Sequence, residues 1–160
     1  MFNETKIVIS DVRFSYAKVF KPEAMNEGDE KKYSVSVLFA KNHPQIVEIR
    51  AAIKAAYDAG ISTKFGGQKP RKWKNPLRDG DEDKPDEEAY EGMYFINATS
   101  KRQPAIVDKK IQPILDEEEF YSGCYGRIDI NFFAFAAKGN KGVAAGLNNV
   151  QKLRDGDSLG

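Results

Sequence analysis

Aromatic residues occur next to lysines and arginines at several places in the chain, and these mixed clusters are the strongest candidates for a binding site. Phosphate groups attract lysine and arginine, while aromatic rings stack on unpaired bases, each stack contributing about 1 to 3 kcal/mol. A single patch of this kind has an ordinary explanation, because a tyrosine can pack in the core and a basic run can be a solvated surface. Because the pattern recurs, the sequence predicts contact with nucleic acid. The patches are Tyr16, Lys18, Phe20 and Lys21; Lys72, Trp73, Lys74 and Arg78; Lys101 and Arg102 in "TSKRQP"; and Tyr125 and Arg127 in "YGR".

The segment "KFGGQKPRKWKNPLRDGDEDKPDEEAYEGMYF" reverses its charge halfway along. It is too long for a simple turn and too rich in charge and proline for a core. We therefore predict a mobile loop excursion at about residues 61–91, whose basic half contacts the nucleic-acid backbone. Trp73 has no periodic apolar neighbours, so it is either an exposed stacking residue or an anchor for the loop. The cations of the basic half are Lys64, Lys69, Arg71, Lys72, Lys74 and Arg78, and residues 79–91 are acidic except for Lys84.

Catalytic motifs are scarce. The chain has no paired cysteines or histidines with zinc-ligand spacing and no Gly-x-Ser-x-Gly elbow, so no cofactor or metal is predicted. The carboxylates Asp108, Asp129 and those of residues 116–119 offer the hard oxygen ligands that a magnesium-dependent nuclease needs. A solvated acidic loop explains "LDEEEF" better, so an enzyme is the weaker alternative.

Length and composition predict one soluble domain covering residues 1–160. Cys124 is the only cysteine, so no disulfide within the chain is available and a reducing cytoplasm is the expected location. The first residues, "MFNETKIVIS", lack the features of a secretory signal, and no later apolar run is long enough to span a bilayer.

Strand patterns dominate the chain. Apolar and polar residues alternate in "KIVISDVRFSYAKVF", in "KYSVSVLFA" with one face on a core, and in "GRIDINFFAF", while "KGNKG" predicts a hairpin turn. One helix is predicted, with Asn42 as its N-cap, Gln45 as capping partner and Gly60 as its C-terminal stop. These elements predict a mainly β fold: an antiparallel barrel of the OB-fold type with one α-helix and a long charged loop insertion.

Several longer stretches carry a family resemblance. "RFSYAKVFKP", "KKYSVSVLFAKN", "GMYFINATSKRQPAIVD" and "FYSGCYGRIDINFFAFAAKGNKGVAAGLNNVQKLRDGDSLG" occur in this order. Together they resemble a family of bacteriophage single-stranded-DNA-binding proteins first catalogued as a domain of unknown function. The resemblance runs from about residue 6 to the end of the sequence, and "GVAAGLNNVQKLRDGDSLG" is its most specific part.

The resemblance implies an OB-fold protein that binds single-stranded DNA without strict sequence preference during phage replication or recombination. It implies that Tyr16, Phe20, Lys101, Arg102, Tyr121, Tyr125 and Arg127 lie on or near the DNA face. Replication or recombination proteins and a second copy of the chain are the partners that it suggests. The sequence itself leaves open a second class of function, a phage recombination or assembly adaptor acting through protein contacts.

One departure from related proteins concerns acidic charge. Many single-stranded-DNA-binding proteins end in an acidic tail that recruits partners and competes with DNA, whereas the last residues here, "RDGDSLG", hold only Asp155 and Asp157. We hypothesise that residues 79–91 fold over the basic groove as an internal counterpart. Deleting residues 79–88 is then expected to tighten DNA binding.

Overall fold

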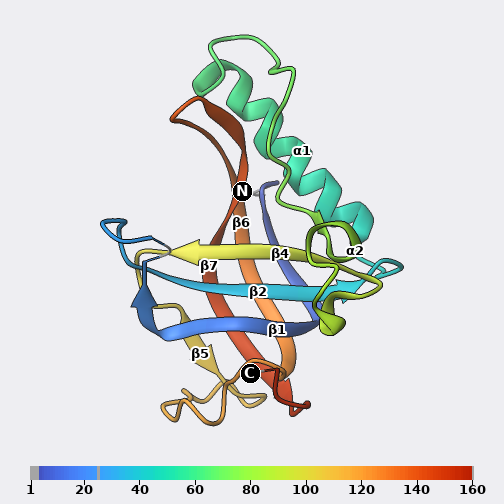
Figure 1. Ribbon diagram of the computed structural model, residues 1–160, viewed down its shortest axis with the longest axis vertical. Coiled ribbons are helices and arrows are strands. Elements are labelled where there is room, and N and C mark those ends of the chain that lie inside the picture. The colour runs from blue at the N-terminus through green and yellow to red at the C-terminus, as the bar shows by residue number, and fades with distance from the viewer. Residues whose placement is uncertain (1–3, 25, 160) are drawn as a thin grey trace.

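The computed structural model describes residues 4–24 and 26–159, and its elements are arranged around one β-sheet (Figure 1). The strands are β1 (Lys6–Glu23), β2 (Lys32–Ala40), β3 (Arg78–Asp79), β4 (Met93–Ser100), β5 (Ala105–Val107), β6 (Tyr125–Ala137) and β7 (Asn140–Arg154). The helices are α1 (Ile46–Thr63), the short α2 (Gly80–Asp83) and the 3-10 turn η1 (Glu88–Tyr90).

The sheet closes into a barrel. Its strand order is β3-β4-β2-β1-β6-β7-β5, and an additional parallel pairing joins β4 to β7 at Ala98 with Ala145 and Thr99 with Gly146. Five strands, β4, β2, β1, β6 and β7, therefore form a closed mixed barrel, with β3 and β5 attached outside the ring. The predicted mainly β barrel with one long helix is confirmed, except that the closing β4–β7 pair is parallel and not antiparallel.

Strand β1 is long enough to serve two partners because it bends. Its first half pairs with β6 and its second half with β2, and register shifts fall between Ile9 and Val12 and between Ser15 and Lys18. Asp11 and Tyr16 at these shifts have positive φ angles of 54° and 47°. Bulges of this kind turn a strand through a barrel corner and redirect the side chains beside them.

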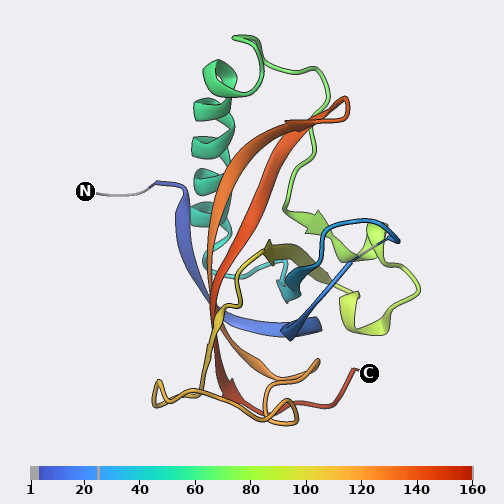
Figure 2. The same cartoon turned by 90° about the vertical axis from the view of Figure 1, so that its left-hand side faces the viewer.

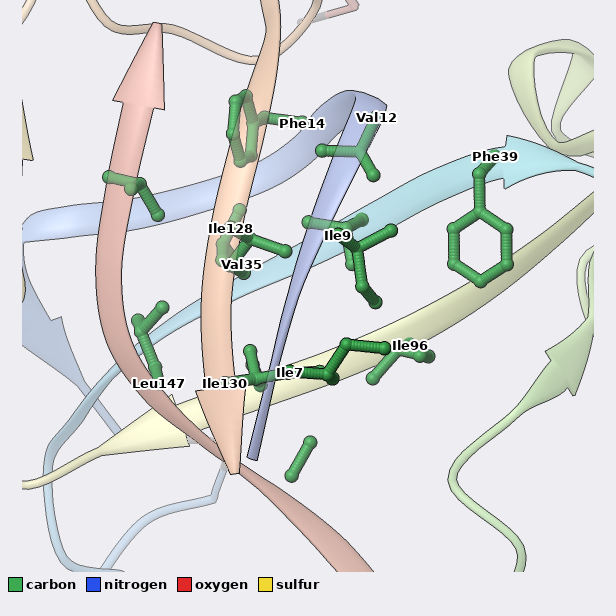
Figure 3. Close-up of a cluster of buried hydrophobic side chains, with 14 of the residues drawn as sticks. Ile7, Ile9, Val12, Phe14, Val35, Phe39, Ile96, Ile128, Ile130 and Leu147 are labelled. Carbon is green, nitrogen blue, oxygen red and sulfur yellow. The ribbon is translucent and has the colours of Figure 1, made fainter. Parts of the chain in front are cut away.

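Alternating apolar side chains fill the barrel (Figure 3). On β6, Ile128, Ile130 and Phe132 are buried, as the alternation in the sequence predicts. They meet Ile9 and Phe14 from β1 in the same cluster. Each such side chain contributes about 1.5 to 3 kcal/mol when removed from water, so this cluster is the principal source of stability for the strands that carry the site.

Helix α1 differs at both ends from the prediction. It begins at Ile46 after Gln45, without a side-chain cap, so Asn42 is not its N-cap. Gln45 instead accepts a hydrogen bond from Ser10 N–H at 2.8 Å and donates to the Val8 carbonyl at 2.9 Å, which ties the helix to β1. Gly60 lies inside the helix. A Cβ there would collide with Ala134 of β6, so this glycine permits close packing and does not stop the helix.

The β6–β7 hairpin extends beyond the barrel next to α1 (Figure 2). The two strands pair as far as Ala137 with Asn140, and Lys138 and Gly139 form the turn with φ angles of 52° and 80°. Two successive positive φ angles are typical of the hairpin turn that matches strand twist. The predicted hairpin at "KGNKG" is confirmed.

The charged insertion follows the surface and contacts it repeatedly, and its mobility stays a prediction. It starts after Thr63, where α1 ends. Phe65 is 2% exposed, and Trp73 packs with its ring centroid 4.8 Å from that of Tyr57 on α1. Lys74 N–H donates to the Lys141 carbonyl at 2.9 Å. The insertion is therefore attached to α1 and to the hairpin by apolar and backbone contacts.

Residues 79–91, which we call the acidic lobe, cover the outer face of β2. Tyr90 is 1% exposed and packs with Leu38 and Phe95, and its hydroxyl donates to Ser36 Oγ at 3.1 Å. Lys41 Nζ lies 2.8 Å from Asp79 and 2.7 Å from Asp81. The expectation that only one face of β2 meets a core is wrong, because the lobe buries Leu38 and Ser36 on the other face.

Candidate nucleic-acid interface

A groove runs beside the second half of β1, and we call it the β1 groove. Two adjoining pockets of about 420 and 440 Å³ form it, and they share Ser122 and Ser158. The first pocket is lined by Tyr16 and the acidic lobe, and the second by Lys18, Phe20, Lys21 and Tyr121. Residues from the first and the last long motif of the sequence thus lie in one surface.

Backbone hydrogen bonds hold the two sides of the groove together. Gly123 N–H donates to the Phe14 carbonyl at 2.8 Å, and Phe14 N–H donates to the Cys124 carbonyl at 2.9 Å. Ser122 Oγ accepts from Ala17 N–H at 3.0 Å, and the Ser122 carbonyl accepts from Leu159 N–H at 2.9 Å. The segment before β6 is therefore fixed against β1, and the groove is formed before any ligand binds.

Tyr16 presents the most exposed aromatic ring of the groove, with 48% of its surface accessible. Its hydroxyl donates to the Glu87 carboxylate at 2.5 Å, and Lys84 Nζ lies 5.4 Å from the ring centroid. The hydrogen bond to Glu87 raises the pKa of Tyr16 to about 12, because ionisation would place two negative charges side by side. The acidic lobe thus reaches the groove through Glu87.

Lys18, Phe20 and Lys21 line the second pocket. Phe20 is half-buried and packs against the main core, whereas Lys21 is exposed. Lys18 Nζ lies 3.7 Å from Glu23, a solvent-exposed pair that a phosphate can replace at small cost. This pocket therefore combines aromatic residues with two ammonium groups, and the carboxylates of Glu23 and Glu117 also line it.

The tyrosines of the last motif lie in different surroundings. Tyr121 is half-buried, and its hydroxyl donates to Asp155 at 2.9 Å while Lys152 Nζ lies 5.2 Å from its ring centroid. The guanidinium groups of Arg13 and Arg154 lie 5.1 and 3.8 Å from the ring centroid of Tyr125. Tyr121 belongs to the β1 groove, whereas the Tyr125 ring is engaged with two arginines beside it.

Arg127 and the β4 end are placed separately. Arg127 is exposed on the outer face of β6 and lines a third pocket with Val8 and Ile111. Lys101 and Arg102 are exposed just after β4, and Lys101 Nζ lies 3.5 Å from Glu30. Gln103, which the sequence reading missed, donates to the Val19 carbonyl at 3.2 Å and so brings this segment to β1.

A second cationic surface lies at the far end of the hairpin, and we call it the basic tip. Both views place this tip and the C-terminal end at opposite ends of the molecule (Figures 1 and 2). Lys138 and Lys141 of the turn join it because Lys74 bridges to Gly142. Sequence reasoning missed both lysines, although "KGNKG" displays them. The exposed cations of the tip are Lys64, Lys69, Arg71, Lys72, Lys74, Lys138 and Lys141, and none has an ion pair within residues 4–24 and 26–159.

Two members of the predicted basic half have structural contacts. Trp73 is half-buried and packs against the core and Tyr57, which is the anchoring alternative for this residue. Arg78 Nε lies 2.9 Å from Asp83, and its guanidinium lies over the Phe95 ring at 5.3 Å. Arg78 thus belongs to the acidic lobe and not to the basic tip.

The carboxylates considered for a nuclease are dispersed. Asp108 accepts from the backbone N–H groups of Gln112 and Lys110, which lowers the pKa of its carboxyl. Asp129 accepts from Asn149 at 2.7 Å, and Asp116 accepts from Glu118 N–H at 2.8 Å. Within the part of the chain that the structure describes, no three His, Cys, Asp or Glu residues form a group that could hold a metal ion.

Burial raises the pKa of the Cys124 thiol, and a buried protonated thiol is a poor nucleophile. Among residues 4–24 and 26–159, no helix is both long and apolar enough to cross a membrane.

Comparison with known proteins gives a consistent result. The family model described as the ssDNA-binding protein of Enterobacter phage Enc34 matches residues 5–160. Protein p50 of Acyrthosiphon pisum secondary endosymbiont phage 1 is 31% identical over 96% of this chain and 86% of its own length.

Solved structures agree with the sequence matches. The single-stranded DNA-binding protein from bacteriophage Enc34 in complex with ssDNA superposes with a TM-score of 0.85 at 28% identity, covering 98% of this chain and 90% of that one. A single-stranded DNA binding protein encoded by bacteriophage T7 gives a TM-score of 0.67 at 15% identity, covering 98% and 95%, and supports likeness of fold alone. The predicted likeness to OB-fold binding proteins is therefore confirmed.

Proposed function

This chain belongs to the ssDNA-binding protein family of Enterobacter phage Enc34, and we propose that it coats single-stranded DNA during phage replication and recombination. The observation that carries the proposal is the β1 groove, where the rings of Tyr16, Phe20 and Tyr121 line the same surface as Lys18 and Lys21. Rings stack on bases of any type, while lysines hold phosphates, so binding needs no strict sequence preference and no catalytic residue.

In this proposal the β1 groove and the basic tip contact different parts of the DNA. The β1 groove takes bases, with phosphates beside Lys18 and Lys21. The basic tip, through Lys69, Arg71 and Lys72, holds the backbone of a further stretch of the strand. Lys101, Arg102, Tyr125 and Arg127 are assigned to the margins of the DNA path on the strength of the family motifs.

A titration with labelled oligothymidine tests the function. We expect fluorescence anisotropy to report binding that weakens steeply with salt, with a slope of about −0.7 in log affinity per phosphate contacted. Duplex DNA of equal length is the matched competitor and is expected to bind more weakly, because its bases are already stacked and paired. Absence of binding at low salt would contradict the proposal and favour the protein-adaptor alternative.

Trp73 provides a second readout of the same titration. Because its ring packs on Tyr57 near the basic tip and not in the β1 groove, its fluorescence reports on the tip. We expect quenching that follows the salt dependence of the anisotropy signal. Binding without any change in Trp73 fluorescence would show that DNA does not reach the tip.

A further inference from the structure

The pocket beside Tyr16 has an unusual set of polar groups for a surface that meets DNA. Its polar side chains are the carboxylates of Glu87 and Glu88 and the hydroxyls of serines and tyrosines, and among the described residues no lysine or arginine lines it. Lys84 Nζ, 3.6 Å from Glu87, offsets one of the two carboxylate charges, and the remaining charge of Glu88 disfavours a phosphate, since like charges at short range repel. The occupant that fits is the uncharged part of a nucleotide, the base.

Glu87 is held in a fixed position at the edge of the Tyr16 ring. Its carboxylate accepts the Tyr16 hydroxyl at 2.5 Å and lies 3.6 Å from Lys84 Nζ. Its backbone carbonyl accepts from Tyr90 N–H at 3.0 Å, and the buried Tyr90 ring anchors the whole turn on β2 and β4. The acceptor is therefore positioned before a ligand arrives, and little ordering is lost on binding.

A carboxylate beside a stacking ring distinguishes bases by their edges. Ionised Glu87 has only acceptor oxygens, so it is satisfied by a donor such as the amino group of cytosine. Thymine and uracil present a carbonyl oxygen at the equivalent position, which the carboxylate repels. Lys84 occupies one face of the Tyr16 ring, so a stacked base uses the other face and turns its edge toward the acidic lobe.

We propose that the pocket beside Tyr16 binds an unpaired base bearing an exocyclic amino group, and that Glu87 is the residue selecting it over thymine or uracil. The inference rests on the proposed single-strand function and adds a graded base preference to it. The backbone of the selected nucleotide passes on the side of Lys18 and Lys21, whose pocket adjoins this one at Ser122 and Ser158.

The test compares oligodeoxycytidine with oligodeoxyuridine of equal length at pH 8, because the two bases differ only in the amino or carbonyl group and the adjoining ring nitrogen. We expect the wild-type protein to bind the cytidine oligomer about two- to tenfold more tightly, the range of one net hydrogen bond. In Glu87→Gln the amide offers both a donor and an acceptor, so the ratio of the two affinities is expected to fall to about one. Glu91→Gln, in the same lobe but outside the pocket, is the matched control and is expected to keep the wild-type ratio.

The possible outcomes distinguish failure of the base selection from failure of single-strand binding. Equal affinity of the wild-type protein for both oligomers would overturn the base selection and leave single-strand binding intact. Glu87→Gln that tightens both oligomers by the same factor would also overturn it, because Glu87 would then act only through general repulsion. Failure of every oligomer to bind would remove the proposed function and this inference together.

Discussion

The β1 groove and the basic tip use the same residue types in opposite ways. In and around the groove most cations are paired, as in Lys18 with Glu23, Lys84 with Glu87 and Lys152 with Asp155, while Lys21 has no ion pair within the described residues. The aromatic rings of Tyr16, Phe20 and Tyr121 there are exposed or half-exposed. At the tip seven cations have no ion pair within the described residues, and the tryptophan beside them is packed into the fold. The comparison shows that the charge reversal in the insertion divides it between two places: the basic half lies against α1 and the β6–β7 hairpin, and the acidic half lies on the outer face of β2. Under the proposed function, affinity through phosphates would come mainly from the tip and discrimination among bases from the groove.

Removing positive charge from the basic tip is expected to change the affinity for single-stranded DNA more than any other substitution considered. In a variant carrying Lys69→Gln, Arg71→Gln, Lys72→Gln and Lys141→Gln, we expect affinity for oligothymidine to fall on the order of 100-fold at low salt. The slope of log affinity against log salt is expected to become shallower by about 0.7 for each lost phosphate contact. Anisotropy titrations at several salt concentrations measure both quantities.

The control for the tip variant removes charge elsewhere on the molecule. Lys54→Gln, Lys109→Gln and Lys110→Gln change residues on α1 and on the loop after β5, none of which lines the β1 groove or belongs to the basic tip. They are expected to leave the salt slope close to that of the wild-type protein. An unchanged slope in the tip variant itself would show that phosphates are held elsewhere, and the division between the two surfaces would fail.

Removing the exposed ring of the groove is the complementary change. Tyr16→Ala deletes a stacking surface, so we expect about a tenfold loss of affinity for oligothymidine, within the range of 1 to 3 kcal/mol per stacked base. The salt slope is expected to stay constant, because no phosphate contact is lost. Tyr16→Phe keeps the ring without the bond to Glu87 and should retain most of the affinity. A steep change of salt slope in Tyr16→Ala would place Tyr16 in the phosphate path.

The features that the sequence predicts well are those determined by neighbours in the chain. Burial of Ile128, Ile130 and Phe132 follows from an alternation of period two, and the hairpin follows from "KGNKG". Helix α1 was predicted, yet its start was not, because Gln45 bonds to Ser10 and Val8 across the fold. A local capping rule cannot include such a partner.

Local sequence patterns predict even less of the candidate site, because its contacts join residues far apart in the chain. Tyr16 and Phe20 could be proposed from ring and charge spacing alone, but the bond between Tyr16 and Glu87 joins residues 71 positions apart. The cations of the insertion join Lys138 and Lys141 because Lys74 bridges to Gly142 of the hairpin. Burial of Leu38 under Tyr90 likewise depends on where the insertion returns. These outcomes depend on barrel closure, which no local pattern encodes.

Removing negative charge from the acidic lobe is expected to have a smaller effect on the affinity for single-stranded DNA. Deleting residues 79–88 would disrupt Lys41 pairing and leave Leu38 uncovered, so substitution is the cleaner test of the lobe as an internal competitor. Glu82→Gln, Asp86→Asn and Glu88→Gln remove charges that have no ion pair within residues 4–24 and 26–159. We expect affinity for oligothymidine to increase about threefold at low salt and the gain to vanish at high salt, where such fields are screened. An equal or lower affinity would refute the competitor role.

The smallest expected effect is a pH titration that needs no DNA. The bond to Glu87 raises the pKa of Tyr16 to about 12, above the ordinary value of about 10. At pH 11 Tyr16 is therefore expected to be mostly protonated in the wild-type protein and ionised to a larger extent in Glu87→Gln. Ultraviolet difference absorbance measures this increase in tyrosinate, with Tyr16→Phe supplying the background.

The sign of the same shift sets its effect on stability. Because the pKa of Tyr16 is raised in the folded chain, the contribution of this bond is complete below pH 10 and is lost as the pH rises toward 12. The wild-type protein is expected to lose free energy of unfolding between pH 9 and pH 11, and Glu87→Gln is expected to lose less over the same range. Identical tyrosinate absorbance in wild-type and Glu87→Gln proteins at pH 11 would mean that Glu87 does not hold the Tyr16 hydroxyl in solution, and the groove would then lack the fixed acceptor that distinguishes it from the tip.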